Sequence, residues 1–407
     1  MNSFYASCEQ QVNHTLRDRP VAVCIHTGKN SSVIAPSIEA QNRGIRAGMR
    51  LDEALRLCPE LIPVETNVER YREFHVAIIT VLRQFTPDVV PKSIDEAVVD
   101  LTRCQPGDGK EVARQIKSDI RTKVGDWLRC SIGIAPNALL AKLGADLYTP
   151  DGLVVITPET IDDVLKRLTL TDLPGMGHRM ARRLEEQGIL TPLELRYASP
   201  ERLRAVCKSI IGWHWHLRLN FGDEMALDTG VYQSLQATRT MAANQRESAE
   251  RLDEQLQSLC LTLERRMVRQ AVFCQVVVFA CRYRDGRHYG DEIKLPEPKQ
   301  DSRALYHLIR QRFEQFQRTH PGEPVLNRSI RSLSVRVFRF IPAQAVAIPL
   351  FEDPVRKNAL RKTLYDVKER FGSDKLMRAA DLGKDPVFRD GAGFGAVRDL
   401  HDDQNPF

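Results

Sequence analysis

The chain has 407 residues, enough for roughly two to four domains that each have their own core. Hydrophobic residues make up 42% and charged residues 28%, which is typical of a globular protein. No apolar run approaches the roughly 20 residues that span a bilayer, and the first residues do not have the pattern of a secretion signal, so we expect neither a membrane span nor secretion. The nine cysteines include no Cys-x-x-Cys pair, so we expect a reducing cytoplasm rather than a zinc site or disulfide framework.

The net charge of +6 comes from one segment. Residues 231–342 hold 19 Lys and Arg against 12 Asp and Glu, a net charge of +7, and 17 of the 19 are arginine. Arginine suits bidentate contacts to phosphate. The segment therefore indicates either a nucleic-acid surface or an ordinary solvated one.

In the first 158 residues, short apolar runs alternate with helical patterns. A buried strand is predicted over 21–25, and short helices are predicted over 37–43 and 52–57. A longer helix over 69–85 leads into two strands around 93–100, a helix over 110–127, and strands over 130–134 and 153–156. This order predicts an α+β domain with helices on one face of a mixed sheet.

The second half divides into a helical segment and an alternating one. Residues 159–222 are predicted to be helical, with turns at 174–177, Gly188 and Gly212, and 223–230 is predicted to be a linker. Strand, helix, strand, strand, helix and strand follow over 232–240, 248–268, 272–283, 288–295, 301–318 and 329–340, a β-α-β-β-α-β order that is ferredoxin-like. A last helix is predicted over 353–371.

Asp95-Glu96 is the strongest chemical signal. Successive strand side chains point to opposite faces, so two adjacent carboxylates reach one point only at a turn or a twisted strand end. Such a pair supplies the hard oxygen ligands that divalent cations prefer, and two cations can drive an in-line phosphoryl transfer. The alternative is an exposed hairpin turn, where Asp-Glu is common.

The surrounding motifs resemble those of the Y-family translesion DNA polymerases, especially the bacterial DinB-like and UmuC-like groups. The resemblance rests on Phe4-Tyr5-Ala6-Ser7-Cys8-Glu9, on Ser93-Ile94-Asp95-Glu96-Ala97, and on Ser131-Ile132-Gly133-Ile134-Ala135-Pro136-Asn137. It implies a multidomain right-hand polymerase with a mixed-sheet palm (1–8 and 68–158), small fingers (9–67), a helical thumb (159–224), a linker (225–231), a ferredoxin-like little finger (232–342) and a tail (343–407).

Site residues follow from the resemblance. Asp95 and Glu96 are expected to be catalytic and, with the carbonyl of Met1, to bind two Mg²⁺ ions, for which Mn²⁺ can substitute. Tyr5 matches the steric gate against a 2′-hydroxyl, and Phe4 beside it is either a nucleotide contact or ordinary core. The expected nucleotide-binding residues are Phe4, Tyr5, Ser32, Ile34, Gln41 and Lys142.

Several positions depart from the family pattern. Ile38 and Gln41 stand where the family has Tyr and Arg on the triphosphate, and Ala138 and Thr149 stand where it has lysines. By the same resemblance, residues 2–8 are expected to lie at the end of a central palm strand. The family also has an aspartate directly before the position of Met1, so we expect weak or Mn²⁺-favouring activity from the chain as numbered. Charge-assisted hydrogen bonds contribute about 1.5–3 kcal/mol each, so nucleotide binding should be weakened.

Two further motifs indicate contacts with DNA and with a sliding clamp. Leu173-Pro174-Gly175-Met176-Gly177 predicts a helix-hairpin-helix that binds phosphate through Gly175 and Gly177, or else a plain αα-hairpin. Ala347-Ile348-Pro349-Leu350-Phe351 resembles the clamp-binding pentapeptide of polymerases, with Ile348, Leu350 and Phe351 as anchors, or else is a strap on the protein's own surface. Arg331 and Arg336 are the expected DNA contacts of the little finger.

The sequence therefore predicts a monomeric, cytoplasmic DNA-dependent DNA polymerase that bypasses damage, with primer-template DNA, deoxynucleoside triphosphates and a sliding clamp as partners and no membrane. A rival is a weak or non-catalytic Y-family-like subunit that binds DNA and clamp and recruits another polymerase. A purely structural damage-binding protein would leave Asp95-Glu96 without a purpose.

Overall fold

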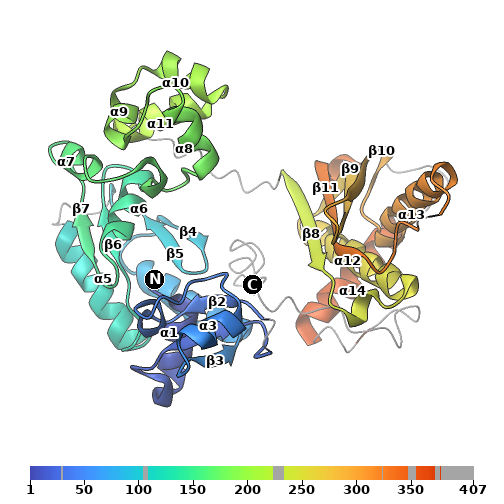
Figure 1. The fold of residues 1–407 in the computed structure, drawn as a ribbon, viewed down its shortest axis with the longest axis horizontal. Helices are drawn as coiled ribbons and strands as arrows, with labels where there is room; N and C mark the ends of the chain where they lie inside the picture. Colours follow the sequence, from blue (N-terminus) through green and yellow to red (C-terminus); the bar gives the residue numbers. More distant parts are fainter. Residues whose placement is uncertain are drawn as a thin grey trace. The chain divides into compact units, whose positions relative to one another are not determined.

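The computed structural model describes residues 1–28, 31–103, 109–222, 233–322, 324–346, 354–371 and 376. The described residues divide into two compact units, unit 1 within residues 1–222 and unit 2 within residues 233–376, and each unit combines helices and strands (Figure 1). The predicted α+β class is confirmed. Within the described ranges, no helix is long and apolar enough to cross a membrane.

Unit 1 begins with a helix where a strand end is predicted over residues 2–8. Ser3 has a left-handed φ of 47°, and α1 starts immediately after it. A small sheet follows, in which β1 pairs antiparallel with β2 and parallel with β3. All four residues of β1 are buried, as a continuous apolar run predicts. The elements are α1 (Phe4–Val12), η1 (His14–Leu16), β1 (Val21–Cys24), β2 (Val33–Pro36), α2 (Ile38–Gln41), α3 (Leu51–Leu57) and β3 (Ile62–Glu65).

The next segment supplies two separate strand pairs rather than the single mixed sheet that the element order predicts. β4 and β5 form an antiparallel hairpin, whereas β6 and β7 pair in parallel. α6 packs closely on β6 at Gly133, where only a glycine fits: a Cβ there would lie 1.9 Å from the carbonyl oxygen of Ala141. The elements are α4 (Val68–Leu82), β4 (Val89–Ser93), β5 (Glu96–Val99), α5 (Gly109–Lys123), β6 (Ile132–Ile134), α6 (Ala138–Leu147) and β7 (Leu153–Val155).

The last part of unit 1 is helical, as predicted. Thr191 and Ser199 accept capping hydrogen bonds at two helix starts, each followed by proline in the first turn. The predicted turn at Gly212 is wrong: this residue lies inside α11, where a Cβ would meet the carbonyl oxygen of Leu203 at 2.2 Å. The elements are α7 (Ile161–Leu165), η2 (Leu170–Asp172), α8 (His178–Glu185), α9 (Pro192–Tyr197), α10 (Pro200–Cys207) and α11 (Ile211–Leu219).

Unit 2 is a four-stranded antiparallel sheet with strand order β10-β9-β11-β8. The element order is the predicted β-α-β-β-α-β, and the first strand, β8, pairs with the fourth, β11, as in a ferredoxin-like sheet. The difference is that β11 pairs on its other side with the second strand, β9, whereas a ferredoxin-like sheet places the first strand beside the third. The elements are β8 (Ser234–Thr240), η3 (Asn244–Arg246), α12 (Ala249–Arg269), β9 (Val272–Tyr283), β10 (His288–Lys299), α13 (Ser302–Thr319), β11 (Ile330–Pro342), η4 (Ala343–Ala345) and α14 (Pro354–Phe371).

The core of unit 2 lies between its sheet and its helices. The apolar residues at helical spacing on α12 are all buried, together with the inward residues of the sheet. α14 is fixed to this core by the buried carboxylate of Glu264, which accepts hydrogen bonds from the Ser302 amide (2.6 Å) and the Tyr365 hydroxyl (3.0 Å). The buried face of α12 consists of Leu252, Leu256, Leu259, Leu263 and Met267.

Candidate active site

The two carboxylates of the predicted site lie at the tip of the β4–β5 hairpin. Ser93 pairs with Glu96 across the hairpin, so Ile94 and Asp95 form its two-residue turn. The Ser93 hydroxyl donates to Asp95 Oδ1 at 2.6 Å and accepts from the Asp95 amide at 3.4 Å. Asp95 therefore lies in the turn and Glu96 begins β5 directly after it, so both carboxylates lie at one chain reversal.

Segments far apart in the sequence meet at this turn. The Met1 nitrogen donates to the Asp95 carbonyl oxygen at 2.6 Å, which brings the beginning of the chain to the hairpin. Tyr5, in the first turn of α1, lies close enough to Asp95 for the carboxylate charge to disfavour ionisation of its hydroxyl. Burial, together with the charge of Asp95 and the thiol of Cys8, raises the pKa of Tyr5 well above its ordinary range. Its hydroxyl is therefore a neutral group.

Tyr5 lies among other aromatic rings. Its ring centroid is 5.8 Å from that of Phe4 and 4.9 Å from that of Tyr71 on α4. Phe4 is only 3% exposed and belongs to the core, so it supports Tyr5 by packing. The Tyr71 hydroxyl donates to Glu9 Oε1 at 2.8 Å, and Arg70 pairs with the other oxygen of the same buried carboxylate. Glu9, Arg70 and Tyr71 were not among the site residues predicted from the sequence.

Lys142 on α6 reaches the hairpin. Its Nζ donates to Glu96 Oε1 and to Asp146 Oδ1, each at 2.7 Å. Desolvation disfavours the ammonium, but the hydrogen bonds to Asp146 and Glu96 outweigh it and leave the pKa of Lys142 raised. The structure thus brings the predicted Lys142 to the carboxylate pair as a permanent cation.

The predicted nucleotide-binding residues in and beside the small sheet differ in their surroundings. Gln41 Nε2 donates to the Ser3 hydroxyl at 2.8 Å and to the Pro36 carbonyl at 3.3 Å, so it joins α2 to the start of α1. Ser32 is exposed, and its backbone forms an isolated antiparallel β-bridge with that of Arg50. Ile34 is half-buried within β2. Among the described residues, no hydrogen bond or ion pair joins Ser32 or Ile34 to the carboxylate turn.

The side chains at the turn supply few ligands for the expected cations. In the ranges that the structure describes, no group of three or more His, Cys, Asp or Glu side chains could hold a metal ion. Asp95 and Glu96 alone match the way Mg²⁺ binds in nucleotide enzymes, where one or two carboxylates act together with substrate phosphates. The residues therefore fit a cation that the nucleotide completes, and not an independent metal cage.

His75 is a further residue at the turn that sequence reasoning missed. It lies on α4, is 2% exposed, and its Nδ1 is 2.7 Å from the carbonyl oxygen of Ile94. Burial lowers the pKa of His75 despite this hydrogen bond and the nearby Asp95 charge, which favours the neutral ring. A polar residue on the apolar face of a predicted helix was the available signal.

The glycine turn of the helical segment has the geometry that its sequence predicts. Gly175 has a left-handed φ of 87°, and Gly177 is the N-cap of α8. A Cβ at either position would meet no atom within 4 Å, so the turn is open to an approaching group. Backbone N–H groups at such a helix start can bind phosphate.

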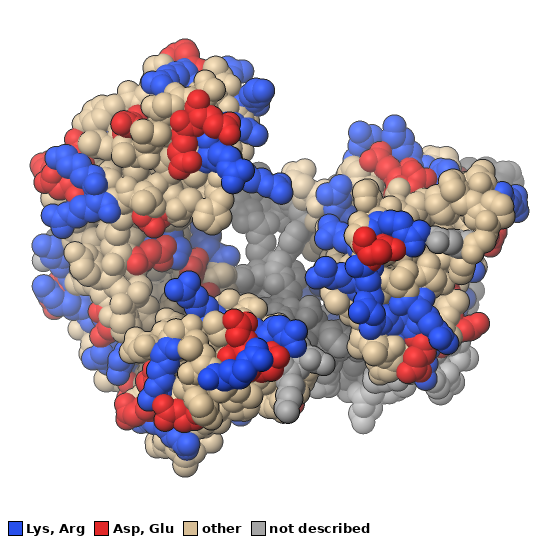
Figure 2. Space-filling view, viewed as in Figure 1, with Lys and Arg blue, Asp and Glu red and all other residues tan. Residues whose placement is uncertain are grey.

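In unit 2, the predicted arginines are exposed on β11. Leu333, Val335 and Val337 point into the core, so the alternate residue Arg336 points to the opposite face of the sheet. Arg331 is exposed at the register irregularity near the start of the strand. Lys and Arg side chains gather over the visible face of unit 2 (Figure 2).

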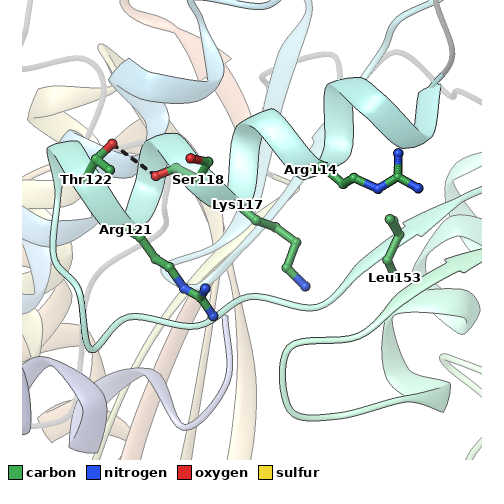
Figure 3. Close-up of a pocket in the computed structure, with 6 residues that line it drawn as sticks. All are labelled: Arg114, Lys117, Ser118, Arg121, Thr122 and Leu153. Carbon is green, nitrogen blue, oxygen red and sulfur yellow. Dashed lines mark hydrogen bonds between the residues drawn. The ribbon is translucent and has the colours of Figure 1, made fainter.

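A hollow of about 430 Å³ on unit 1 lies along α5 and does not include the predicted site residues (Figure 3). Lys117 and Arg121 pair there with Asp151, and Lys117 also donates to the carbonyl oxygen of Gly152 at 3.3 Å. These contacts hold the loop before β7 against α5, which accounts for Lys117 and Arg121 as structural residues. The hollow is lined by Arg114, Lys117, Ser118, Arg121, Thr122 and Leu153.

The predicted clamp anchors Ile348, Leu350 and Phe351 lie outside the described residues. Their role in binding a clamp therefore stays a prediction from the sequence.

Comparison with known protein families gives three matches. Residues 1–146 match the impB/mucB/samB family, and residues 232–350 match the C-terminal domain of the same family. Residues 167–206 match a SAM-like helix-hairpin-helix tandem, which agrees with the turn at Gly175 and Gly177.

Individual relatives cover nearly the whole chain. DNA polymerase IV 1 of Halalkalibacterium halodurans is 29% identical over 94% of this chain and 92% of its own length. DNA polymerase IV of Pelotomaculum thermopropionicum is 28% identical over 97% of this chain and 96% of its own. Among solved structures, a Y-family DNA polymerase chimera superposes with a TM-score of 0.69 at 22% identity, over 84% of this chain and 97% of the chimera. The fold is thus that of a right-hand polymerase.

Proposed function

Because the chain belongs to the impB/mucB/samB family of Y-family DNA polymerases, we propose that it extends primers on damaged DNA templates. The substrates are primer-template DNA and deoxynucleoside triphosphates, and the protein acts as a monomer in the cytoplasm. The observation that carries the proposal is the meeting of Asp95, Glu96, Tyr5 and Lys142 at one hairpin turn. These residues come from three separate helices and strands, so an ordinary surface turn does not account for them.

The roles of the residues follow from their chemistry. Asp95, Glu96 and the Met1 carbonyl would hold two Mg²⁺ ions, or Mn²⁺, which supply activation of the primer 3′-hydroxyl and neutralisation of the leaving pyrophosphate. Lys142 brings a positive charge to the nucleotide's phosphates, exchanging its hydrogen bond to Glu96 for one to phosphate. Tyr5, neutral and held by aromatic neighbours, presents a wall against a 2′-hydroxyl.

The decisive experiment removes both carboxylates. Asp95→Ala with Glu96→Ala should abolish primer extension, while primer-template affinity stays within about threefold because DNA is held by phosphate contacts elsewhere. A matched control removes two exposed carboxylates near α7, Glu159→Ala with Asp163→Ala, and should extend normally. Equal loss of DNA binding and extension in the first double variant would refute the assignment.

The same measurement separates the rival function. A wild-type chain that binds primer-template tightly, extends nothing with Mg²⁺ or Mn²⁺, and yet stimulates another polymerase would be a non-catalytic subunit. The observation behind this rival is that Gln41 and Ile38 replace charged or hydroxyl-bearing contacts, and that Gln41 is engaged by Ser3.

DNA binding is assigned to two surfaces that are described separately. In unit 1, the open backbone at Gly175 and Gly177 suits a phosphate. In unit 2, Arg336 lies on a sheet face whose neighbours Gln236 and Ser334 are small or uncharged, so a phosphate backbone can approach it. Such contacts carry no sequence information, which suits a polymerase that must accept any template.

The pentapeptide at 347–351 is assigned to a sliding clamp on its sequence alone. Replacing its three apolar anchors by alanine should abolish clamp-dependent stimulation, because such a peptide binds mainly through apolar side chains in a pocket. Synthesis on short oligonucleotides without clamp should be unchanged. Loss of clamp-free activity would mark the segment as a structural strap. The substituted residues are Ile348, Leu350 and Phe351.

A further inference from the structure

The turn that carries Asp95 lacks the backbone geometry that closes two-residue hairpins unaided. Such loops favour type I′ or II′ turns, which need a positive φ at one or both central residues. Neither Ile94 nor Asp95 is among the positive-φ residues of the described chain. A register irregularity between Pro91 and Ser93 accompanies the turn. Its conformation therefore depends on further hydrogen bonds, one from Ser93 within the hairpin and two from outside it.

Those contacts hold the peptide units on both sides of Asp95. The Ile94 carbonyl and the Asp95 N–H belong to one planar peptide unit. His75 holds the oxygen end at 2.7 Å, and the Ser93 hydroxyl lies 3.4 Å from the nitrogen end. The following peptide unit is held at the Asp95 carbonyl by the Met1 nitrogen. Of these groups, His75 is the one contributed by the packed interior of α4.

The direction of the His75 hydrogen bond is determined. A carbonyl oxygen only accepts, so Nδ1 must carry the proton and donate it. His75 is 2% exposed and Ile94 is 5% exposed, so water does not readily replace this donor. Without it, the carbonyl would turn toward another donor and would rotate the peptide unit that precedes Asp95.

We propose that His75 is a positioning residue, which orients the Ile94–Asp95 peptide and thereby sets the affinity of the site for its divalent cation. The inference rests on the proposed function, because it assumes that Asp95 is a metal ligand. Residues that orient metal ligands typically change metal affinity or activity by about 10- to 100-fold when they are replaced. We expect a change of that size at His75.

Three substitutions separate the hydrogen bond from the packing. His75→Asn keeps an N–H donor near the position of Nδ1, His75→Gln moves the donor outward toward that of Nε2, and His75→Leu has none. The measurements are the affinity for Mn²⁺, from the electron paramagnetic resonance of free Mn²⁺ with a dideoxy-terminated primer-template and nucleotide, and separately kcat, KM and primer-template Kd. Thermal unfolding reports whether each variant folds.

We expect His75→Leu and His75→Gln to weaken Mn²⁺ binding and kcat/KM by about 10- to 100-fold, with primer-template Kd within about twofold. His75→Asn should restore most of both losses. If His75→Leu fails to fold, the comparison of Asn with Gln still decides. Folded variants with wild-type Mn²⁺ affinity, or equal losses in Asn and Gln, would overturn the inference alone. A wild-type chain that neither binds Mn²⁺ nor extends primers would overturn the proposed function and this inference with it.

Discussion

The aromatic support of Tyr5 gives a graded test of the steric gate. Tyr71 is fully buried, its ring centroid lies 4.9 Å from that of Tyr5, and its hydroxyl donates to the buried carboxylate of Glu9. The hydroxyl and the ring can be removed separately. Tyr71→Phe deletes the hydrogen bond and keeps the ring, whereas Tyr71→Leu deletes both.

Tyr71→Phe should affect stability alone, whereas Tyr71→Leu should also affect nucleotide discrimination. A hydrogen bond to a charged group contributes about 1.5–3 kcal/mol to the free energy of unfolding. Because Arg70 still pairs with Glu9 in Tyr71→Phe, we expect this variant to lower the free energy of unfolding by an amount near the lower end of that range. An aromatic pair contributes about 0.5–1.5 kcal/mol beyond the area it buries. If that contact holds Tyr5 in place, Tyr71→Leu should reduce discrimination between deoxy- and ribonucleotides by about two- to twelvefold.

The assay is the ratio of kcat/KM for a deoxynucleotide and the matching ribonucleotide, alongside amide hydrogen exchange of α1 and α4. Tyr71→Phe should exchange faster in these helices and keep the wild-type ratio. Tyr71→Leu should exchange faster in these helices and also have a lower ratio than the wild type. Tyr5→Ala should lower the ratio more than either Tyr71 variant. If Tyr5→Ala and Tyr71→Leu both retain the wild-type ratio, Tyr5 is not the gate.

Two other predictions use different parts of the chain. Arg331→Ala with Arg336→Ala should weaken DNA binding on all sequences alike and reduce the slope of log K against log salt by about one for each phosphate that is no longer neutralised; an unchanged slope would remove these arginines from the DNA surface. Gly133→Ala should destabilise unit 1 by more than the roughly 1–3 kcal/mol typical of overpacking, because the new Cβ meets the Ala141 carbonyl oxygen at 1.9 Å. The control Gly177→Ala, whose Cβ would meet no atom within 4 Å, should leave thermal unfolding unchanged. Similar unfolding temperatures for the two variants would contradict the packing argument.

Local structure was predictable wherever one face of an element is buried. The leucines of α12 recur at helical spacing and are all buried, and the alternation along β11 correctly separates Arg336 from Val335 and Val337. In both cases burial of a single face imposes the period of the element on the sequence. For the carboxylate pair, strand alternation allowed a turn or a twisted strand end, and the structure shows a two-residue turn.

Long-range pairing was not predictable for the same reason. Element order does not fix which strands become neighbours, so the separate β4–β5 and β6–β7 pairs and the position of β11 between β9 and β8 could not be read from periodicity. Gly212 was misassigned because a glycine needed for close helix packing has the same sequence signal as a glycine in a turn.

The site shows the same limit at the level of single residues. The identity of Asp95 and Glu96 carries their chemistry, so both could be named in advance. His75 lies 19 residues from its partner Ile94, and Glu9 lies 62 residues from Tyr71. Nothing local in the sequence marks such pairs, because they arise only when α4 packs beside both α1 and the hairpin.

This dependence on distant support also bears on whether the chain is catalytic. A two-residue hairpin loop closes unaided with residues such as Asn-Gly, which adopt the positive φ angles that suit the twist of the strands. The Ile94–Asp95 turn forgoes that geometry and relies instead on hydrogen bonds from His75, Ser93 and Met1. A subunit that only bound DNA and a clamp would be served better by a turn that closes by itself. A turn whose peptide planes are fixed by these added hydrogen bonds suits a carboxylate that must face a cation in one orientation, so the structure favours the catalytic alternative.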